Sequence, residues 1–172
     1  MKWILTLLCN LFTLILLAQS PEANLRNLNI QLPPVSQPIA NYVRAVQTGN
    51  LLFLSGHAPK RNDGTLITGK VGADLTIEQG YEAAKITTLN LLATLRETLG
   101  SLDRVRRIVK VTGYVNCGAD FTKHPQVING CSDLLISVFG ERGKHARSAM
   151  AMISLSNNMA VEIEMVVELA PE

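Results

Sequence analysis

Residues 76–100 read TIEQGYEAAKITTLNLLATLRETLG, which is the clearest helical signal in the chain. Thr76 and Gln79, three residues apart, form the capping-box pattern that opens a helix. Apolar or small side chains then recur at helical spacing until Gly100, a residue typical of helix ends. These side chains belong to Tyr81, Ala84, Thr88, Leu91, Leu92, Leu95 and Leu99. The pattern predicts a long amphipathic helix whose stripe packs into a protein core.

Strand-like segments lie on both sides of this helix. Upstream, two apolar runs are separated by turn residues, which predicts a β-hairpin. Downstream, an alternating stretch rich in β-branched residues predicts a long strand, and two further strands follow a second helix. The expected strands are 42–46, 51–54, 105–115, about 148–153 and about 159–168, and the second helix is 125–139. This order predicts an α+β fold with both helices on one face of a mixed sheet. The other face stays partly apolar, which favours oligomerisation.

The N-terminal residues have the composition of an export signal. Lys2 supplies a positive charge, residues 3–17 are mostly apolar, and small residues begin at Ala18. This pattern predicts a signal peptide at residues 1–18, and hence a periplasmic or secreted protein that is not in the membrane after cleavage. The alternative is an uncleaved membrane anchor, although a spanning helix needs about 20 apolar residues and this run is shorter.

The rest of the chain divides into two segments. Residues 19–38 are rich in Asn, Pro and Gln, which predicts an irregular N-terminal segment. Residues 39–172 are expected to form one domain, long enough to bury a core without metals or disulfides. Hydrophobic residues make up 47% of the whole chain and charged residues 17%, as in globular proteins.

Charge and cysteine usage exclude several classes of function. The formal net charge is +2, whereas phosphate recognition usually needs a basic face, so we expect no nucleic-acid partner. The cysteines form no CxxC pair and the three histidines are scattered, so we expect no metal site. In an oxidising compartment Cys117 and Cys131 could pair, but two buried free thiols are the interpretation that we prefer.

Four segments resemble the RidA/YjgF family of reactive-intermediate deaminases, also described as endoribonuclease L-PSP-like. They are residues 42–56, residues 120–130, residues 145–150 and residues 161–164. The resemblance covers roughly residues 35–170, and residues 69–72 resemble a longer, less characterised branch. It implies a chorismate-mutase-like fold and a homotrimer with ligand clefts between subunits. The implied activity is hydrolysis of enamines or imines, such as 2-aminoacrylate, to 2-keto acids and ammonia. That reaction uses water and needs no cofactor.

The resemblance also assigns site residues whose chemistry fits that reaction. Arg147 matches the signature arginine, and its planar guanidinium can bind a substrate carboxylate with two hydrogen bonds. Glu162 matches the catalytic glutamate, which can orient water or carry a proton. Tyr42 and Ser55 match substrate-binding positions, since their hydroxyls can bond substrate or water. Asn129 matches a cleft position that the neighbouring subunit contributes.

The spacing of Arg147 and Glu162 constrains the topology. If the last two strands formed a simple hairpin, the two residues would lie on the order of 17 Å apart along it. That separation is too large for both to bind one small substrate. We therefore expect that the two strands are not direct neighbours, or that the pair meets across a subunit interface.

Two departures from the family pattern keep other functions open. Ala149 stands where family deaminases often carry Cys, and Leu155-Ser156 where they often carry Leu-Pro. One alternative is a non-catalytic trimer that binds small carboxylates or protects other proteins, which a Glu162 turned away from Arg147 would favour. An endoribonuclease ranks last, because the chain lacks a His pair suited to acid–base cleavage and a basic stripe.

Overall fold

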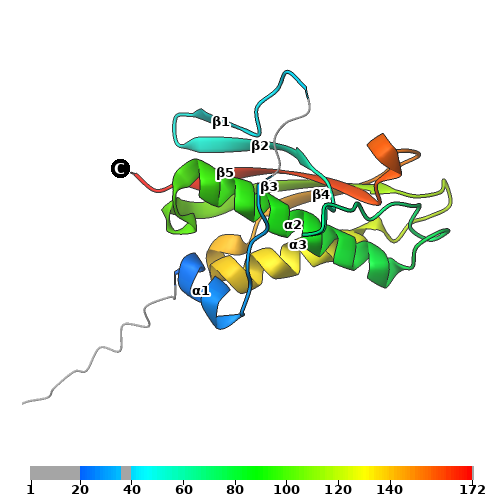
Figure 1. Cartoon of the computed structure of the whole chain (residues 1–172), viewed down its shortest axis with the longest axis horizontal. Coiled ribbons are helices and arrows are strands. Elements are labelled where there is room, and N and C mark those ends of the chain that lie inside the picture. The colour runs from blue at the N-terminus through cyan, green and yellow to red at the C-terminus, as the bar shows by residue number, and fades with distance from the viewer. Residues whose placement is uncertain (1–19, 36–39, 172) are drawn as a thin grey trace, which may run out of the picture.

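A computed structural model of the chain describes residues 20–35 and 40–171. It contains a mixed five-stranded sheet of order β1-β2-β5-β3-β4, with the helices packed on one face (Figure 1). The strands are β1 (Ala45–Thr48), β2 (Leu51–His57), β3 (Val105–Asn116), β4 (Ala146–Met152) and β5 (Val161–Leu169), and the helices are α1 (Pro21–Asn27), α2 (Ile77–Leu99) and α3 (His124–Phe139). The predicted α+β fold is confirmed. The predicted signal peptide lies outside the described residues.

Local sequence signals set the ends of α2 as predicted. The Thr76 backbone N–H donates to the Gln79 side chain at 2.8 Å, and the Gln79 backbone N–H donates to the Thr76 hydroxyl at 3.2 Å. Gly100 closes the helix in the left-handed conformation, with φ of 79°. Such a cap orders the first and last turns of α2 without help from the rest of the fold.

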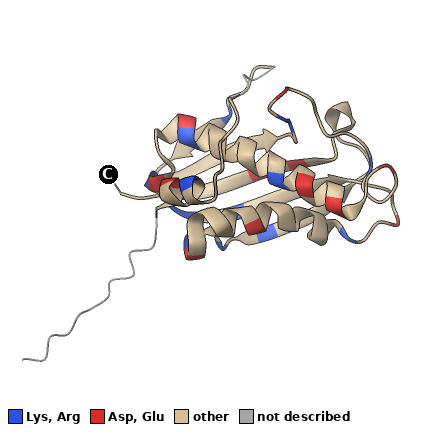
Figure 2. Ribbon diagram, turned by 60° about the horizontal axis from the view of Figure 1, so that its bottom comes forward, with Lys and Arg blue, Asp and Glu red and all other residues tan. Residues whose placement is uncertain are grey.

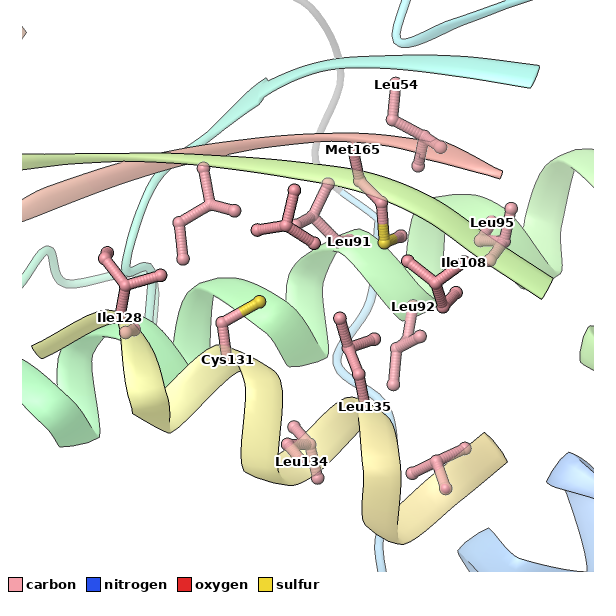
Figure 3. Close-up of a cluster of buried hydrophobic side chains, with 14 of the residues drawn as sticks. Leu54, Leu91, Leu92, Leu95, Ile108, Ile128, Cys131, Leu134, Leu135 and Met165 are labelled. Atoms are coloured by element: carbon pink, nitrogen blue, oxygen red, sulfur yellow. The ribbon is translucent and has the colours of Figure 1, made fainter. Parts of the chain in front are cut away.

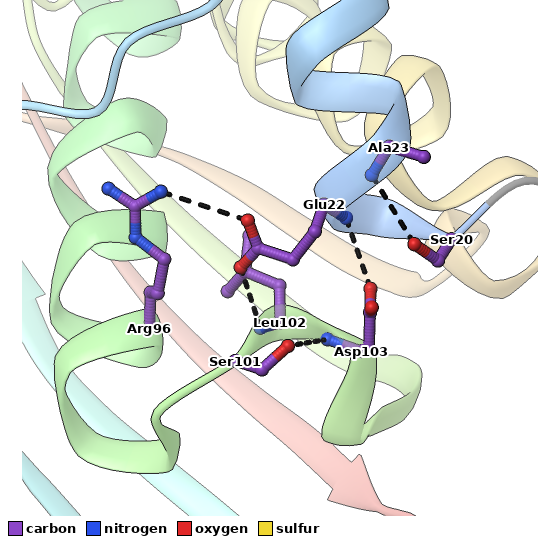
Figure 4. A network of polar contacts seen from close by, with 7 residues as sticks. All are labelled: Ser20, Glu22, Ala23, Arg96, Ser101, Leu102 and Asp103. Carbon is purple, nitrogen blue, oxygen red and sulfur yellow. Dashed lines mark hydrogen bonds and ion pairs between the residues drawn. The ribbon is translucent and has the colours of Figure 1, made fainter.

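Helix α1 corrects our prediction of an irregular segment at residues 19–38. Ser20 caps it, Pro21 occupies its first turn, and Leu25 is buried in the main core. Figure 4 shows how Glu22 fastens the helix: its carboxylate accepts from the Leu102 backbone N–H at 3.0 Å and pairs with Arg96 at 3.8 Å. A short helix that is marginal in isolation is thus stabilised by tertiary contacts.

The two closing strands are not neighbours in the sheet. Strand β3 lies between them, parallel to β4 and antiparallel to β5. This confirms the expectation of a more complex topology than a hairpin. The arrangement also fixes which face each residue of β4 and β5 presents.

The core lies between the sheet and the two long helices. Figure 3 shows Leu91 of α2, Leu135 of α3, and Ile108 and Met165 of the sheet meeting there, each at most 1% exposed. Helices α2 and α3 approach closely at Gly130, where a Cβ atom would lie 2.1 Å from a backbone oxygen of α2. The core is therefore sensitive to small increases in side-chain volume.

The cysteines of the described chain are both free and buried. Cys131 lies among the core side chains in Figure 3, and burial raises the pKa of its thiol to about 11. Cys117 is likewise buried, and burial raises its pKa. The two residues are therefore the inert thiols that we preferred, since a reactive cysteine needs an accessible thiolate.

The sheet face opposite the helices carries exposed apolar side chains. On this face lie Val46, Phe53 and Met150, which are 54%, 44% and 39% exposed. Phe53 alternates with the buried Leu52 and Leu54, as expected for a strand with one covered face. The residual apolar area is the kind of surface that an assembly buries.

A buried imidazole ties β2 to α2. His57 Nδ1 donates to the Ser55 carbonyl at 2.7 Å, and its Nε2 lies 2.8 Å from the Thr94 hydroxyl. Because a carbonyl only accepts, Nδ1 carries the proton and Nε2 accepts from Thr94. Burial lowers the pKa of His57 to about 4, and the charge of Arg44 also lowers it.

The low pKa of His57 predicts a loss of stability in mild acid. Between pH 6.5 and about 4 the unfolded chain binds a proton that the folded chain does not, so the free energy of unfolding falls as the pH falls. The loss attributable to His57 is about 2 to 3 kcal/mol by pH 4.5. Urea denaturation at pH 7.5 and 4.5 measures it, and His57→Gln should reduce the difference by that amount. Equal differences in both proteins would contradict this assignment.

Candidate functional site

Arg147 lies on β4, on the face that α3 covers. Its backbone partner on β3 is the fully buried Val111. Its Nη1 donates to Asn129 Oδ1 at 2.9 Å and to Ser132 Oγ at 3.0 Å, both on α3. Arg147 and Asn129 of one chain are therefore brought together, and no neighbouring subunit is needed for their contact.

The open edge of the Arg147 guanidinium is the central chemical feature of this site. Both hydrogen bonds use Nη1, whose two protons they occupy. Within the described residues, Nε and Nη2 have no protein partner. The Nε–Nη2 edge presents two parallel N–H groups, the geometry that binds a carboxylate with two hydrogen bonds. The side chain is thus anchored at Nη1, and its other edge has no acceptor among the described residues.

Ser132 and His145 complete this anchor, and sequence analysis missed both. His145 Nδ1 lies 2.6 Å from the Gly143 carbonyl and must donate to it, so Nε2 accepts from the Ser132 hydroxyl at 3.1 Å. Burial lowers the pKa of His145, and the Arg147 charge adds to this effect. Ser132 therefore donates to a neutral imidazole and accepts from a guanidinium. The available signals were the two-residue spacing of His145 and Arg147 on one strand face, and the helical spacing of Asn129 and Ser132.

Glu162 lies on β5 and faces away from the helices. It alternates with the buried Val161 and Ile163, and its backbone partner on β3 is Tyr114. Its carboxylate packs against Gly56, where a Cβ atom would lie 2.1 Å from Oε1. Burial raises the pKa of Glu162, and the negative charge of Glu164 raises it further. A carboxylate with a raised pKa is better suited to accept a proton than an exposed one.

Tyr42 and Ser55 both lie near Gly56, the residue against which Glu162 packs. Tyr42 lines a cavity of about 330 Å³ together with Gly56. Ser55 precedes Gly56 on β2, and its buried hydroxyl has no hydrogen-bond partner among the described residues. Ser55 also borders a hollow of about 430 Å³ on the open sheet face, with Glu164. Of the five predicted residues, Glu162, Tyr42 and Ser55 therefore lie around Gly56. The other two, Asn129 and Arg147, lie on α3 and β4.

Within one chain the two groups form separate half-sites. Arg147 is under α3 and Glu162 is on the opposite face, with β3 between their strands. Their registers on β3, at Val111 and Tyr114, differ by three residues, which places their Cα atoms about 14 Å apart. We call Arg147 and Asn129 the arginine half-site, and we call Glu162, Tyr42 and Ser55 the glutamate half-site.

The described residues contain no group of three or more His, Cys, Asp or Glu side chains that could hold a metal ion. Across the same residues, no helix is both long enough and apolar enough to cross a membrane. The chemistry of the two half-sites is that of a guanidinium, a carboxylate and neutral hydroxyls.

Fold and site together define an α+β protein of chorismate-mutase-like architecture in which an arginine of β4 is held by two side chains of α3. Residues 22–169 match the family model described as "YjgF/chorismate_mutase-like, putative endoribonuclease". The chain therefore belongs to the YjgF/RidA-like family, which confirms the resemblance seen in the sequence. Protein TCP17 of Trypanosoma cruzi is 44% identical over 148 residues, which cover 86% of this chain and 92% of that protein.

Two solved structures resemble the chain along most of its length. The Agrobacterium tumefaciens protein Atu1372, of unknown function, superposes with a TM-score of 0.81 at 39% identity and covers 87% of this chain and 92% of its own. A Shewanella oneidensis protein titled "putative endoribonuclease" has a TM-score of 0.84 at 33% identity and covers 88% and 100%. Both share the fold, and their titles leave the chemistry of the site open.

Removing the Ser132 hydroxyl should weaken anion binding at Arg147. Ser132→Ala deletes one of the two acceptors that hold Nη1, so the guanidinium loses orientation. We expect the dissociation constant for pyruvate, measured by calorimetry or ligand-observed NMR, to rise about three- to tenfold. Ser137→Ala is the matched control, because that hydroxyl is on the same helix and bonds only to the Asp133 carbonyl. Equal affinities in the two variants would show that Ser132 does not position Arg147.

Proposed function

We propose that this protein hydrolyses reactive enamines and imines, such as 2-aminoacrylate, to 2-keto acids and ammonia, and that residues 1–18 direct its export. The observation that carries the proposal is the open Nε–Nη2 edge of Arg147. A 2-imino acid carries the carboxylate that this edge fits. The resemblance to the reactive-intermediate deaminases of this family supports the same reaction class without fixing the substrate.

A head-to-tail homotrimer would join the two half-sites into one cleft. The arginine half-site of one subunit would meet the glutamate half-site of the next, and a contact of this heterologous kind closes into a ring. The apolar side chains on the open sheet face, including Val46 and Phe53, support burial of this surface. Each cleft would then contain Arg147 and the partner subunit's Glu162.

The reaction then uses the two groups in sequence. Arg147 holds the substrate carboxylate, and the partner subunit's Glu162 takes a proton from water as the water oxygen attacks the imino carbon. The resulting carbinolamine collapses to the ketone, and the carbon–nitrogen bond breaks. The nitrogen gains one proton from water, through Glu162, when the carbinolamine forms, and a second from the carbinolamine hydroxyl as the carbon–nitrogen bond breaks, so imine and water become keto acid and ammonia.

A carboxylate-binding trimer without catalysis is the second candidate. It is favoured by the position of Glu162, which within one chain faces away from Arg147. Ribonuclease activity ranks last, because basic and acidic residues are interspersed along the ribbon in Figure 2 where phosphate recognition needs a basic face. A measurement of turnover therefore distinguishes imine hydrolysis from carboxylate binding without catalysis.

Replacing Arg147 should abolish the acceleration of imine hydrolysis. With imino acids generated in situ by an amino-acid oxidase, we expect Arg147→Ala to lower kcat/KM about 100-fold, since it removes two charge-assisted hydrogen bonds. Arg147→Lys keeps the positive charge but not the two parallel N–H groups, so its kcat/KM should lie between those of Arg147→Ala and the wild-type protein. Release of ammonia and keto acid is measured, with the exposed-loop variant Arg61→Ala as control.

Glu162→Gln distinguishes catalysis from binding. It should lower kcat and leave pyruvate affinity within about twofold, since the arginine half-site is intact. An unchanged kcat would contradict the role given to Glu162. A wild-type protein that binds pyruvate yet accelerates no imine hydrolysis would establish the binding candidate instead.

A further inference from the structure

Glu162 has a second carboxylate beside it on the open sheet face, and the proposed reaction does not use it. Glu164 follows two positions later on β5, so its side chain shares the face of Glu162 and their Cα atoms lie about 7 Å apart. The pairing of β5 with β3 is regular here, with Tyr114 opposite Glu162 and Thr112 opposite Glu164. Backbone pairing therefore fixes the positions of both carboxylates.

Tyr114 links the two carboxylate positions. Its hydroxyl donates to Glu164 Oε1 at 3.2 Å, although its backbone partner across the strands is Glu162. The side chain thus reaches diagonally from the position of one carboxylate to the other. Burial raises the pKa of Tyr114, and the charges of Glu164 and Glu162 add to this effect, so the phenol stays protonated and remains a donor. The bond fixes the direction of the Glu164 carboxylate without neutralising its charge.

The basic side chains of β3 are engaged elsewhere. Lys110 Nζ donates to the Ser148 hydroxyl at 2.9 Å, and Ser148 is on β4, on the side of β3 away from β5. Arg106 and Arg107 both pair with Glu168, near the end of β5. These contacts direct the three cations away from the two carboxylates.

The other elements that pack against β5 leave the same balance of charge on this face. Among the described residues of β2, Leu51–His57, the ionisable one is His57, and its Nε2 is bonded to Thr94 of α2. Helix α2 itself covers the opposite face of the sheet (Figure 1). Burial raises the pKa of Glu162, and the charge of Glu164 raises it further.

We infer that Glu164 and Tyr114 are positioning residues that act through Glu162: the phenol holds the second carboxylate beside the first, and its negative charge makes the first a stronger base. The inference deepens the proposed function and rests on it for the role of Glu162 in taking a proton from water. General-base catalysis is most efficient when the pKa of the base lies near the operating pH, and a neighbouring like charge moves a carboxyl group towards that range.

The titration of Glu162 tests the pairing without requiring turnover. In protein made with isotope-labelled glutamate, the carboxyl NMR resonance that Glu162→Gln removes is that of Glu162. We expect its titration midpoint to move to lower pH in Glu164→Gln, which removes the charge but keeps an acceptor for the phenol. Tyr114→Phe should move the midpoint in the same direction by less, because it releases the Glu164 carboxylate without removing it.

Glu168→Gln is the matched control. It removes the same charge from the same face of β5, but its Cα lies about 20 Å along the strand from that of Glu162. That separation exceeds the screening length at physiological salt. The Glu162 midpoint in this variant should equal that of the wild-type protein.

The pH profile of imine hydrolysis tests whether the pairing serves catalysis. In Glu164→Gln the acid limb of kcat/KM should move to lower pH, and kcat on the plateau should fall about threefold because Glu162 is then a weaker base. A merely structural role of Glu164 would lower the rate without moving the acid limb.

The outcomes separate this inference from the proposed function. A Glu162 midpoint that is the same in Glu164→Gln and in the wild-type protein would overturn the inference and leave imine hydrolysis standing. A midpoint that falls while the acid limb stays in place would overturn the role of the pair in catalysis. A midpoint that falls in a protein that hydrolyses no imine would support the pairing of the carboxylates and overturn the proposed reaction. Circular dichroism of each variant confirms that it is folded.

Discussion

The position of β3 between β4 and β5 is the constraint on which both half-sites depend. This strand is long, and its buried residues, such as Val111, pack under the helices. Because it separates the two closing strands, Arg147 and Glu162 cannot share one pocket within a chain. Strand alternation then directs Arg147 towards α3 and Glu162 towards the open face. The central strand is thus the reason why the proposed site combines residues from two copies of the chain.

The two half-sites are chemically complementary. One presents a guanidinium with an open edge, and the other a half-buried carboxylate with a raised pKa, that of Glu162. Exposed apolar residues lie on the same face of the sheet as the second group, so the proposed docking of another subunit there would remove both apolar surface and water. Exclusion of water strengthens the electrostatic interactions of both charged groups. In the proposed trimer, the contact that buries apolar surface would therefore also remove water from the cleft.

Sequence patterns predicted the elements whose ends are set locally, and less of what depends on packing. Thr76 and Gly100 define α2 through bonds within a few residues, so their signals could be interpreted directly. Helix α1 was missed because its anchor, Glu22, contacts residues some 80 positions away. Arg147 and Glu162 came from the family resemblance. Ser132 and His145 did not, because their hydrogen bond exists only where α3 lies beside the end of β4.

The two arginines near the proposed cleft differ in how they are held. Arg147 has one nitrogen saturated by Asn129 and Ser132, so its free edge has a defined direction. Arg44 has a buried nitrogen with no acceptor in the described chain. The first arrangement costs little and suits a group that must orient a substrate. The second costs on the order of 1–3 kcal/mol. Of the two, Arg147 is therefore the arginine whose donors are oriented in advance for a carboxylate.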